Sequence, residues 1–193
     1  MAVRLPGTGG YGEPVDESAR RMEPATPSLD AEQAVRAFVA AVDIDGLEIV
    51  DCDPALADTA AFCQAYGYEP ADSANAILVM GKADPPVYAV CVVLATTRLD
   101  VNKTVRKRLG TRRASFAPAE VTTAVSGMAV GGVTPIGLPD GLPVWIDARV
   151  MERERVVLGG GSRAIKVVGP PSVLTALPGA EVVDGLALAP DPG

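Results

Sequence analysis

Two apolar runs near the middle of the chain constrain its fold most strongly. They cover residues 76–80 and 87–95, are rich in β-branched side chains, and are separated by a turn that contains Gly81, Pro85 and Pro86. Runs of this length around a glycine- and proline-containing turn are typical of a β-hairpin. We therefore expect a sheet that contains this hairpin and buries at least one of its faces.

Helical and strand-like segments interleave on both sides of the hairpin, which predicts an α+β fold with a mixed sheet. We expect residues 1–27, rich in Gly, Pro and charge, to form a flexible leader, residues 28–185 to form a single domain, and residues 186–193 to form a tail. Helices are expected at 30–42 with a cap at Ser28 or Asp30, and at 55–66, 101–109, 118–126 and 170–177. Further strands are expected at 47–52, 142–146, 156–158, 164–168 and 182–183.

The composition suits one domain with an aliphatic core. The chain has 193 residues, of which 48% are hydrophobic and only 4% are aromatic. No apolar run reaches the roughly 18 residues of a membrane span, and the N-terminus lacks the apolar core of a secretory signal. Cys52, Cys63 and Cys91 show neither metal-ligand spacing nor a disulfide framework. We expect buried, unreactive thiols, a cytoplasmic location and no contact with membranes.

The chain has no histidine, which limits its chemistry. A serine–histidine or cysteine–histidine triad is impossible, and the commonest metal ligand is missing. We expect no metal and no cofactor. Any reaction must depend on carboxylates, lysines, hydroxyls, backbone dipoles or the substrate itself.

Charge is distributed unevenly along this acidic chain, whose net charge is −7. Residues 41–75 contain eight acids and no Lys or Arg, whereas residues 98–113 contain seven bases and one acid, Asp100. The basic segment can bind phosphate although the whole protein is acidic. It can equally be a solvated helix face or a contact for a protein partner.

Two glycine-rich loops, each bordered by strand-like runs, are the strongest candidates for a binding site. The first covers residues 131–139 and the second covers residues 159–163. Glycine lets backbone N–H groups approach a ligand without an intervening side chain. Tight turns would also explain the glycines, but not Thr134 and Pro135 so specifically.

The order of these segments resembles the YbaK-like aminoacyl-tRNA deacylases, which are similar to the editing domain inserted in bacterial prolyl-tRNA synthetases. The resemblance covers about residues 30–183: the hairpin, a Lys-bearing helix after Leu99-Asp100, a helix ending in Ser126-Gly127, Gly-Gly-Val-x-Pro-x-Gly, and Val-Val-x-Gly-x-Gly-x-Arg. It implies an α+β domain around a mixed, barrel-like sheet. It also implies a free-standing enzyme that hydrolyses the ester between a wrong amino acid and the 3′ end of tRNA.

The resemblance assigns roles to three groups of residues, and it implies tRNA and an aminoacyl-tRNA synthetase as partners. The catalytic group orients the ester carbonyl, and within it Thr134 touches either the amino-acid side chain or the attacking water. The second group holds the terminal adenosine, and the third meets the acceptor stem. The catalytic group is Asn75, Gly131, Gly132, Thr134 and Pro135; the adenosine group is Gly159, Gly160, Gly161, Ser162 and Arg163; the stem group is Arg98, Lys103, Arg106 and Lys107.

One position departs from the family pattern. Asn75 stands where the family has a lysine at the start of the first hairpin strand. Asparagine donates hydrogen bonds but carries no charge, and Lys82 in the predicted hairpin turn is a poor replacement. The chain is therefore either a deacylase in which Asn75 has taken over this role, or a binding protein of the same fold without turnover.

Overall fold

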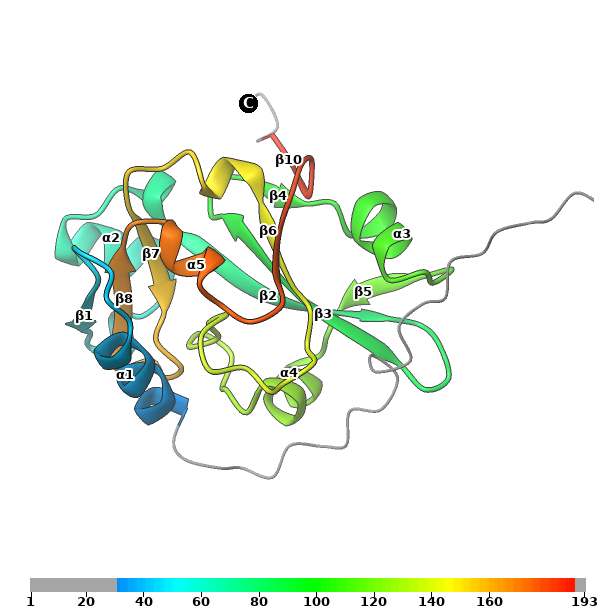
Figure 1. Cartoon of the computed structure of the whole chain (residues 1–193), viewed down its shortest axis with the longest axis horizontal. Helices are drawn as coiled ribbons and strands as arrows, with labels where there is room; N and C mark the ends of the chain where they lie inside the picture. The colour runs from blue at the N-terminus through cyan, green and yellow to red at the C-terminus, as the bar shows by residue number, and fades with distance from the viewer. Residues whose placement is uncertain (1–30, 190–193) are drawn as a thin grey trace, which may run out of the picture.

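A computed structural model describes residues 31–189, and its larger sheet is built on one central hairpin (Figure 1). Strands β2 (Ala74–Gly81) and β3 (Val87–Leu94) run antiparallel and pair along their whole length. This confirms the hairpin that the two apolar runs predict. The predicted leader and the predicted cap at Ser28 or Asp30 lie outside the described residues.

Three more strands complete the larger sheet, in the order β5-β2-β3-β6-β9. Strand β6 runs parallel to both β3 and β9, whereas β2 runs antiparallel to both β3 and β5. The sheet is therefore mixed, as the interleaved pattern predicts, and β9 is the expected edge strand. The added strands are β5 (Ala114–Phe116), β6 (Val144–Asp147) and β9 (Ala180–Val183).

A smaller antiparallel sheet, in the order β1-β8-β7, packs beside the start of the hairpin. A parallel bridge between Ser73 and Val157 joins the two sheets where β2 begins. The joined sheets form the mixed, barrel-like arrangement. The strands of the smaller sheet are β1 (Glu48–Asp51), β7 (Val156–Gly159) and β8 (Ile165–Gly169), and a third pair consists of β4 (Arg98–Leu99) and β10 (Ala187–Leu188).

The helices are short and mostly occupy the predicted places. Asp100 accepts hydrogen bonds from the backbone N–H groups of Lys103 and Thr104, both at 3.2 Å, which confirms the predicted cap of the basic helix. Among residues 31–189, no helix is long and apolar enough to span a membrane. The helices are α1 (Ala31–Ala41), α2 (Thr59–Tyr66), a π-helical turn (Val101–Val105) that leads into α3 (Arg106–Arg108), α4 (Ala119–Ser126) and α5 (Ser172–Thr175).

Several predicted boundaries were wrong for local reasons. The helix expected at 55–66 is split, because Asp58 adopts an extended backbone immediately before α2, leaving a separate 3-10 turn at Pro54–Leu56. The strand expected from residue 142 starts at Val144, after Pro143, which has no N–H to donate. Strands β4, β5 and β10 were missed because two or three residues are too short to show a period.

The two faces of the hairpin carry different helices (Figure 1). Leu78 packs with Val121 and Val125 of α4, whereas its neighbour Val79 packs with Val101 and Val105 of the basic helix. Successive side chains of a strand point to opposite faces, so α3 and α4 cover opposite faces of the sheet. This separation determines which residues can reach the candidate site.

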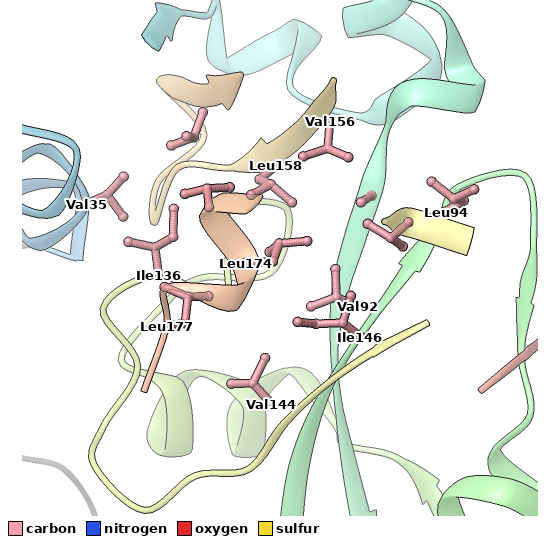
Figure 2. Packing of buried hydrophobic residues seen from close by; sticks show 14 of the residues in the cluster. Val35, Val92, Leu94, Ile136, Val144, Ile146, Val156, Leu158, Leu174 and Leu177 are labelled. Atoms are coloured by element: carbon pink, nitrogen blue, oxygen red, sulfur yellow. The ribbon is translucent and has the colours of Figure 1, made fainter. Parts of the chain in front are cut away.

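The main core lies between the two sheets (Figure 2). Side chains from α1, β3, β6, β7 and α5 converge there with Ile136, which belongs to the first glycine loop and is fully buried. Ile136 thus anchors the loop to the core. The labelled members of this cluster include Val35, Val92, Ile146, Leu158 and Leu174.

The three cysteines are free and buried, which confirms the prediction of buried thiols. Burial raises the pKa of the Cys91 thiol to about 12, although the charge of Arg108 opposes this shift. Burial also raises the pKa of Cys52. A thiol held neutral in this way is a poor nucleophile at physiological pH.

Asp147, at the end of β6, fastens the C-terminal strand to the sheet. It is 1% exposed and accepts hydrogen bonds from the Ala187 N–H at 2.7 Å and the Arg149 Nε at 2.8 Å. Leu186 and Ala187 are buried, so packing continues beyond residue 185, where the domain was expected to end.

We predict that Asp147→Ala lowers the free energy of unfolding by about 2–4 kcal/mol, because it leaves the buried Ala187 N–H without its acceptor and the Arg149 guanidinium without its carboxylate partner. Urea denaturation measures the change. Asp140→Ala, which removes an exposed carboxylate from a loop, should change stability by less than about 0.5 kcal/mol. Equal effects of the two substitutions would contradict this role for Asp147.

Candidate functional site

A cavity of about 350 Å³ lies where the two sheets, the start of α2 and the first glycine loop meet. The hairpin contributes its β2 strand over residues 74–78, and β5 pairs with β2 only from Val79 onward. Within the described chain, no strand therefore covers this edge of β2 at Asn75–Ile77. The polar and glycine positions that line the cavity are Asp58, Thr59, Asn75, Gly131, Gly159 and Lys166.

The two glycine loops pack directly against each other and form one wall of the site. The Gly161 N–H donates to the Gly132 carbonyl at 2.8 Å. A Cβ on Gly132 would lie 2.6 Å from the Ser162 carbonyl carbon, and a Cβ on Gly159 would collide with the Val133 carbonyl oxygen. Only glycine permits this approach of one backbone to another. The resemblance placed both loops at the ligand but did not show that each requires the other.

Two cavity-lining residues of the first loop have N–H groups without a partner among the described residues. They are Gly131 and Val133, and they alternate with Gly132 and Thr134, whose N–H groups donate to the Ala129 carbonyl and the Met128 Sδ. Gly131 has a φ of 94°, a conformation that favours glycine. Backbone donors of this kind can stabilise an oxygen that becomes negative during a reaction.

Asn75 is exposed at the start of β2 and reaches the cavity together with Thr59 of α2. The Thr59 hydroxyl donates to the Asn75 Oδ1 at 3.2 Å. This contact orients the amide so that its two N–H donors remain for a ligand. The structure thus places Asn75 beside the first glycine loop, as the resemblance implies, while its catalytic role stays a prediction.

Lys166 is a cavity residue that the sequence analysis missed. It lies in β8, is only 7% exposed, and donates from Nζ to the Ala57 carbonyl at 2.7 Å. Burial, with a smaller contribution from the charge of Arg163, lowers the pKa of its ammonium group, and nearby Cys52 and Asp58 oppose this shift. The signal was present in the sequence, where one lysine interrupts the apolar strand Ile165–Gly169.

Arg163 lies at the rim of the site rather than in its wall. Its Nη1 donates to Asp58 Oδ1 at 3.1 Å, and its Nε donates to the Pro54 carbonyl at 3.0 Å. The guanidinium also lies against Gly131, where a Cβ would collide with it. Arg163 therefore ties the second loop to the start of α2 and to the first loop.

Other residues assigned by the resemblance do not line this cavity. Thr134 is fully buried, and its Oγ1 accepts from the Ile136 N–H at 3.5 Å. Pro135 lines a second cavity of about 460 Å³. Ser162 donates to Glu32 of α1 at 2.6 Å, which is the main reason that the pKa of Glu32 is lowered. Gly160 and Gly161 pack against Ile165 and the start of α1.

The four residues expected to meet the acceptor stem lie away from the cavity wall. Arg98 is in β4, and Lys103, Arg106 and Lys107 belong to the helical segment that covers the sheet face opposite α4. Thr122 of α4 lines the cavity instead. Within residues 31–189, no group of three Cys, Asp or Glu side chains could hold a metal ion.

We predict that Gly132→Ala separates the two loops, lowers the free energy of unfolding by about 1–3 kcal/mol and abolishes ligand binding in the cavity. Gly46→Ala is the matched control, because Gly46 has a φ of 74° but nothing within 4 Å of an added Cβ. The control should lose stability through backbone strain and keep binding. Thermal unfolding and ligand titration separate the two effects, and unchanged binding in Gly132→Ala would contradict the loop contact.

The comparisons with known proteins agree with this geometry. The crystal structure of a proposed trans-editing enzyme for prolyl-tRNA synthetase superposes with a TM-score of 0.68 at 24% identity, covering 80% of this chain and 95% of that one. A hypothetical protein superposes with a TM-score of 0.68 at 19% identity, covering 82% of this chain and 99% of that one. A scaffold protein used for epitope grafting superposes with a TM-score of 0.68 at 23% identity, covering 81% of this chain and 97% of that one. These structures share the fold.

The family model of the aminoacyl-tRNA editing domain matches residues 53–177, more than half of the chain, and the chain belongs to that family.

Proposed function

We propose that this protein is a free-standing deacylase that hydrolyses the ester of mischarged tRNA. The observation that carries the proposal is that the N–H groups of Gly131 and Val133 have no partner among residues 31–189, and that both residues line the same cavity as Asn75 and Lys166. Membership of the editing-domain family supports the choice of an aminoacyl ester as substrate.

The reaction would add water to the ester carbonyl carbon and form a tetrahedral intermediate with a negative oxygen. The backbone donors of Gly131 and Val133 would stabilise that oxygen without a titratable group, and Asn75 would orient the ester. Collapse of the intermediate breaks the bond to the ribose oxygen and releases the amino acid and the tRNA. The proton lost by water balances the proton gained by the ribose oxygen.

The volume of the cavity limits the size of the amino-acid side chain that it can hold. Alanines from three segments line it, and the accessible space is about 350 Å³. Exclusion by size is modest, because one methylene changes binding by about 1–3 kcal/mol. The alanines are Ala57, Ala74, Ala76 and Ala117.

The acceptor stem would reach the basic segment along the β5 edge of the sheet. Phe116 of β5 is 56% exposed and lines the cavity, and β5 also packs against the π-helical turn that carries Lys103. A stem that follows this edge would meet Arg98, Lys103, Arg106 and Lys107 through its phosphates. Within the same proposal, residues 28–185 act as one editing domain in the cytoplasm, with an aminoacyl-tRNA synthetase as a further partner.

We predict that the full chain hydrolyses tRNA charged with a small, incorrect amino acid about a hundredfold faster than the uncatalysed reaction. A panel of tRNAs carrying amino acids from glycine to phenylalanine, followed by loss of the radiolabelled ester, measures the rates. Activity should decline as the side chain grows. No hydrolysis above background across the panel would contradict the proposed function.

We predict that Asn75→Ala slows this hydrolysis about tenfold, because the ester loses one hydrogen bond that orients it. Gln64→Ala removes an exposed amide from α2, the helix that carries Thr59, without touching the cavity and should leave the rate unchanged. Asn75→Lys tests the binding-protein alternative. If the parent is inactive and Asn75→Lys creates hydrolysis, the chain is a binder that has lost turnover at this position.

A further inference from the structure

Lys166 occupies a position where a charged side chain is unusual. It lies on β8, the central strand of the smaller sheet, paired in register with Val50 on one side and Gly159 on the other. With 7% exposure it is buried beside the apolar cluster of Phe62 and Val168. A lysine at such a place is rare unless a charge partner or a function retains it.

The ammonium group of Lys166 is only partly satisfied by the protein. One N–H donates to the Ala57 carbonyl, and the Phe62 ring centroid lies 5.6 Å from Nζ. Among the described residues, no carboxylate oxygen lies within 4 Å of Nζ. The nearby Asp58 pairs with Arg163 instead. An ammonium group has three donors, so two remain for a ligand.

The buried ammonium shares one recess with the amide at the start of the hairpin. A small void of about 20 Å³ is lined by Thr59, Asn75 and Lys166, and all three also line the main cavity. A positive charge from β8 therefore reaches the region where β2 presents only the neutral Asn75.

We propose that Lys166 is the cationic group that contacts the substrate in this cavity, through an oxygen that carries negative charge. This inference rests on the proposed function and names the residue that supplies the charge absent at Asn75. Two oxygens share the required chemistry: the ester carbonyl oxygen, which becomes negative in the intermediate, and a phosphate oxygen of the terminal nucleotide. The lowered pKa of Lys166 reflects the burial that makes its charge effective at short range.

A purely structural role for Lys166 makes different predictions. If its function were only to hold the Ala57 carbonyl, Lys166→Met would destabilise the fold and leave ligand affinity unchanged in the folded protein. A substrate contact predicts that Lys166→Met weakens ligand binding and does not destabilise the fold. Removing a buried charge that has no carboxylate partner among residues 31–189 should leave the free energy of unfolding equal or higher at neutral pH.

The first experiment measures contact in the unaltered chain, so it does not depend on a variant that folds. The ligand is 3′-alanylamino-3′-deoxyadenosine, with and without a 5′-phosphate, in which an amide replaces the labile ester. The chain has four lysines, and Lys82, Lys103 and Lys107 are exposed internal controls. In protein labelled with ¹³Cε-lysine, saturating ligand should shift the Lys166 signal, assigned by its loss in Lys166→Arg, and leave the other three in place.

The second experiment compares affinities for the same ligand. Lys166→Met should weaken binding about ten- to a hundredfold, whereas Lys82→Met should have no effect. Asn75→Lys should restore part of the affinity in the Lys166→Met background, because it returns a cation to the same recess.

The affinity of the wild-type chain should fall as pH rises through the Lys166 pKa, which lies below the ordinary 10.5. The Lys166→Arg variant stays charged and should not show this fall.

The outcomes separate this inference from the proposed function. An effect of Lys166→Met confined to the phosphorylated ligand assigns the contact to phosphate, and an equal effect on both ligands assigns it to the carbonyl oxygen. A stationary Lys166 signal, or an unchanged affinity in folded Lys166→Met, overturns the inference even if mischarged tRNA is hydrolysed. A shifted signal without hydrolysis of any tRNA overturns the deacylase function and leaves the contact standing.

Discussion

The site depends on one contact between two backbones. Gly132 and Ser162 touch without a side chain between them, and the Gly161 N–H donates to the Gly132 carbonyl. This contact fixes the first loop from one side, while Ile136 fixes it in the core from the other. A loop held at both ends keeps the Gly131 and Val133 N–H groups in place before a ligand arrives, so little reorganisation is needed when charge develops on a bound oxygen.

Much of the fold could be predicted because apolar residues recur at regular spacing in its longer helices and strands. The hairpin, the cap at Asp100 and the helix that ends at Gly127 follow from local sequence. The short strands β4, β5 and β10 could not be predicted, because two or three residues show no period and exist only through their partners. The bridge between Ser73 and Val157, which joins the sheets, is likewise a tertiary property.

The candidate site was only partly predictable, for a similar reason. The resemblance selected Asn75, Gly131 and Gly159, and all three line the cavity. It also selected Thr134, which the structure buries, and Ser162, whose hydroxyl donates to Glu32 of α1. Motif order says which loops meet but not which side of a loop faces a ligand. Lys166 was missed because the apolar residues around it predict a buried strand, and a single lysine does not change that prediction.

Asn75 and Lys166 together bear on how a family site tolerates the loss of a charge. A cation at position 75 would lie at an exposed strand end, where water weakens its field, whereas Lys166 is nearly enclosed. A charge acts more strongly on a nearby oxygen when water is excluded, but its burial also costs stability. A second cation at position 75 would repel Lys166 and lower the pKa of both groups further. The neutral amide is therefore compatible with a buried lysine in the same recess, and the absence of a lysine at position 75 is not by itself a sign of lost function.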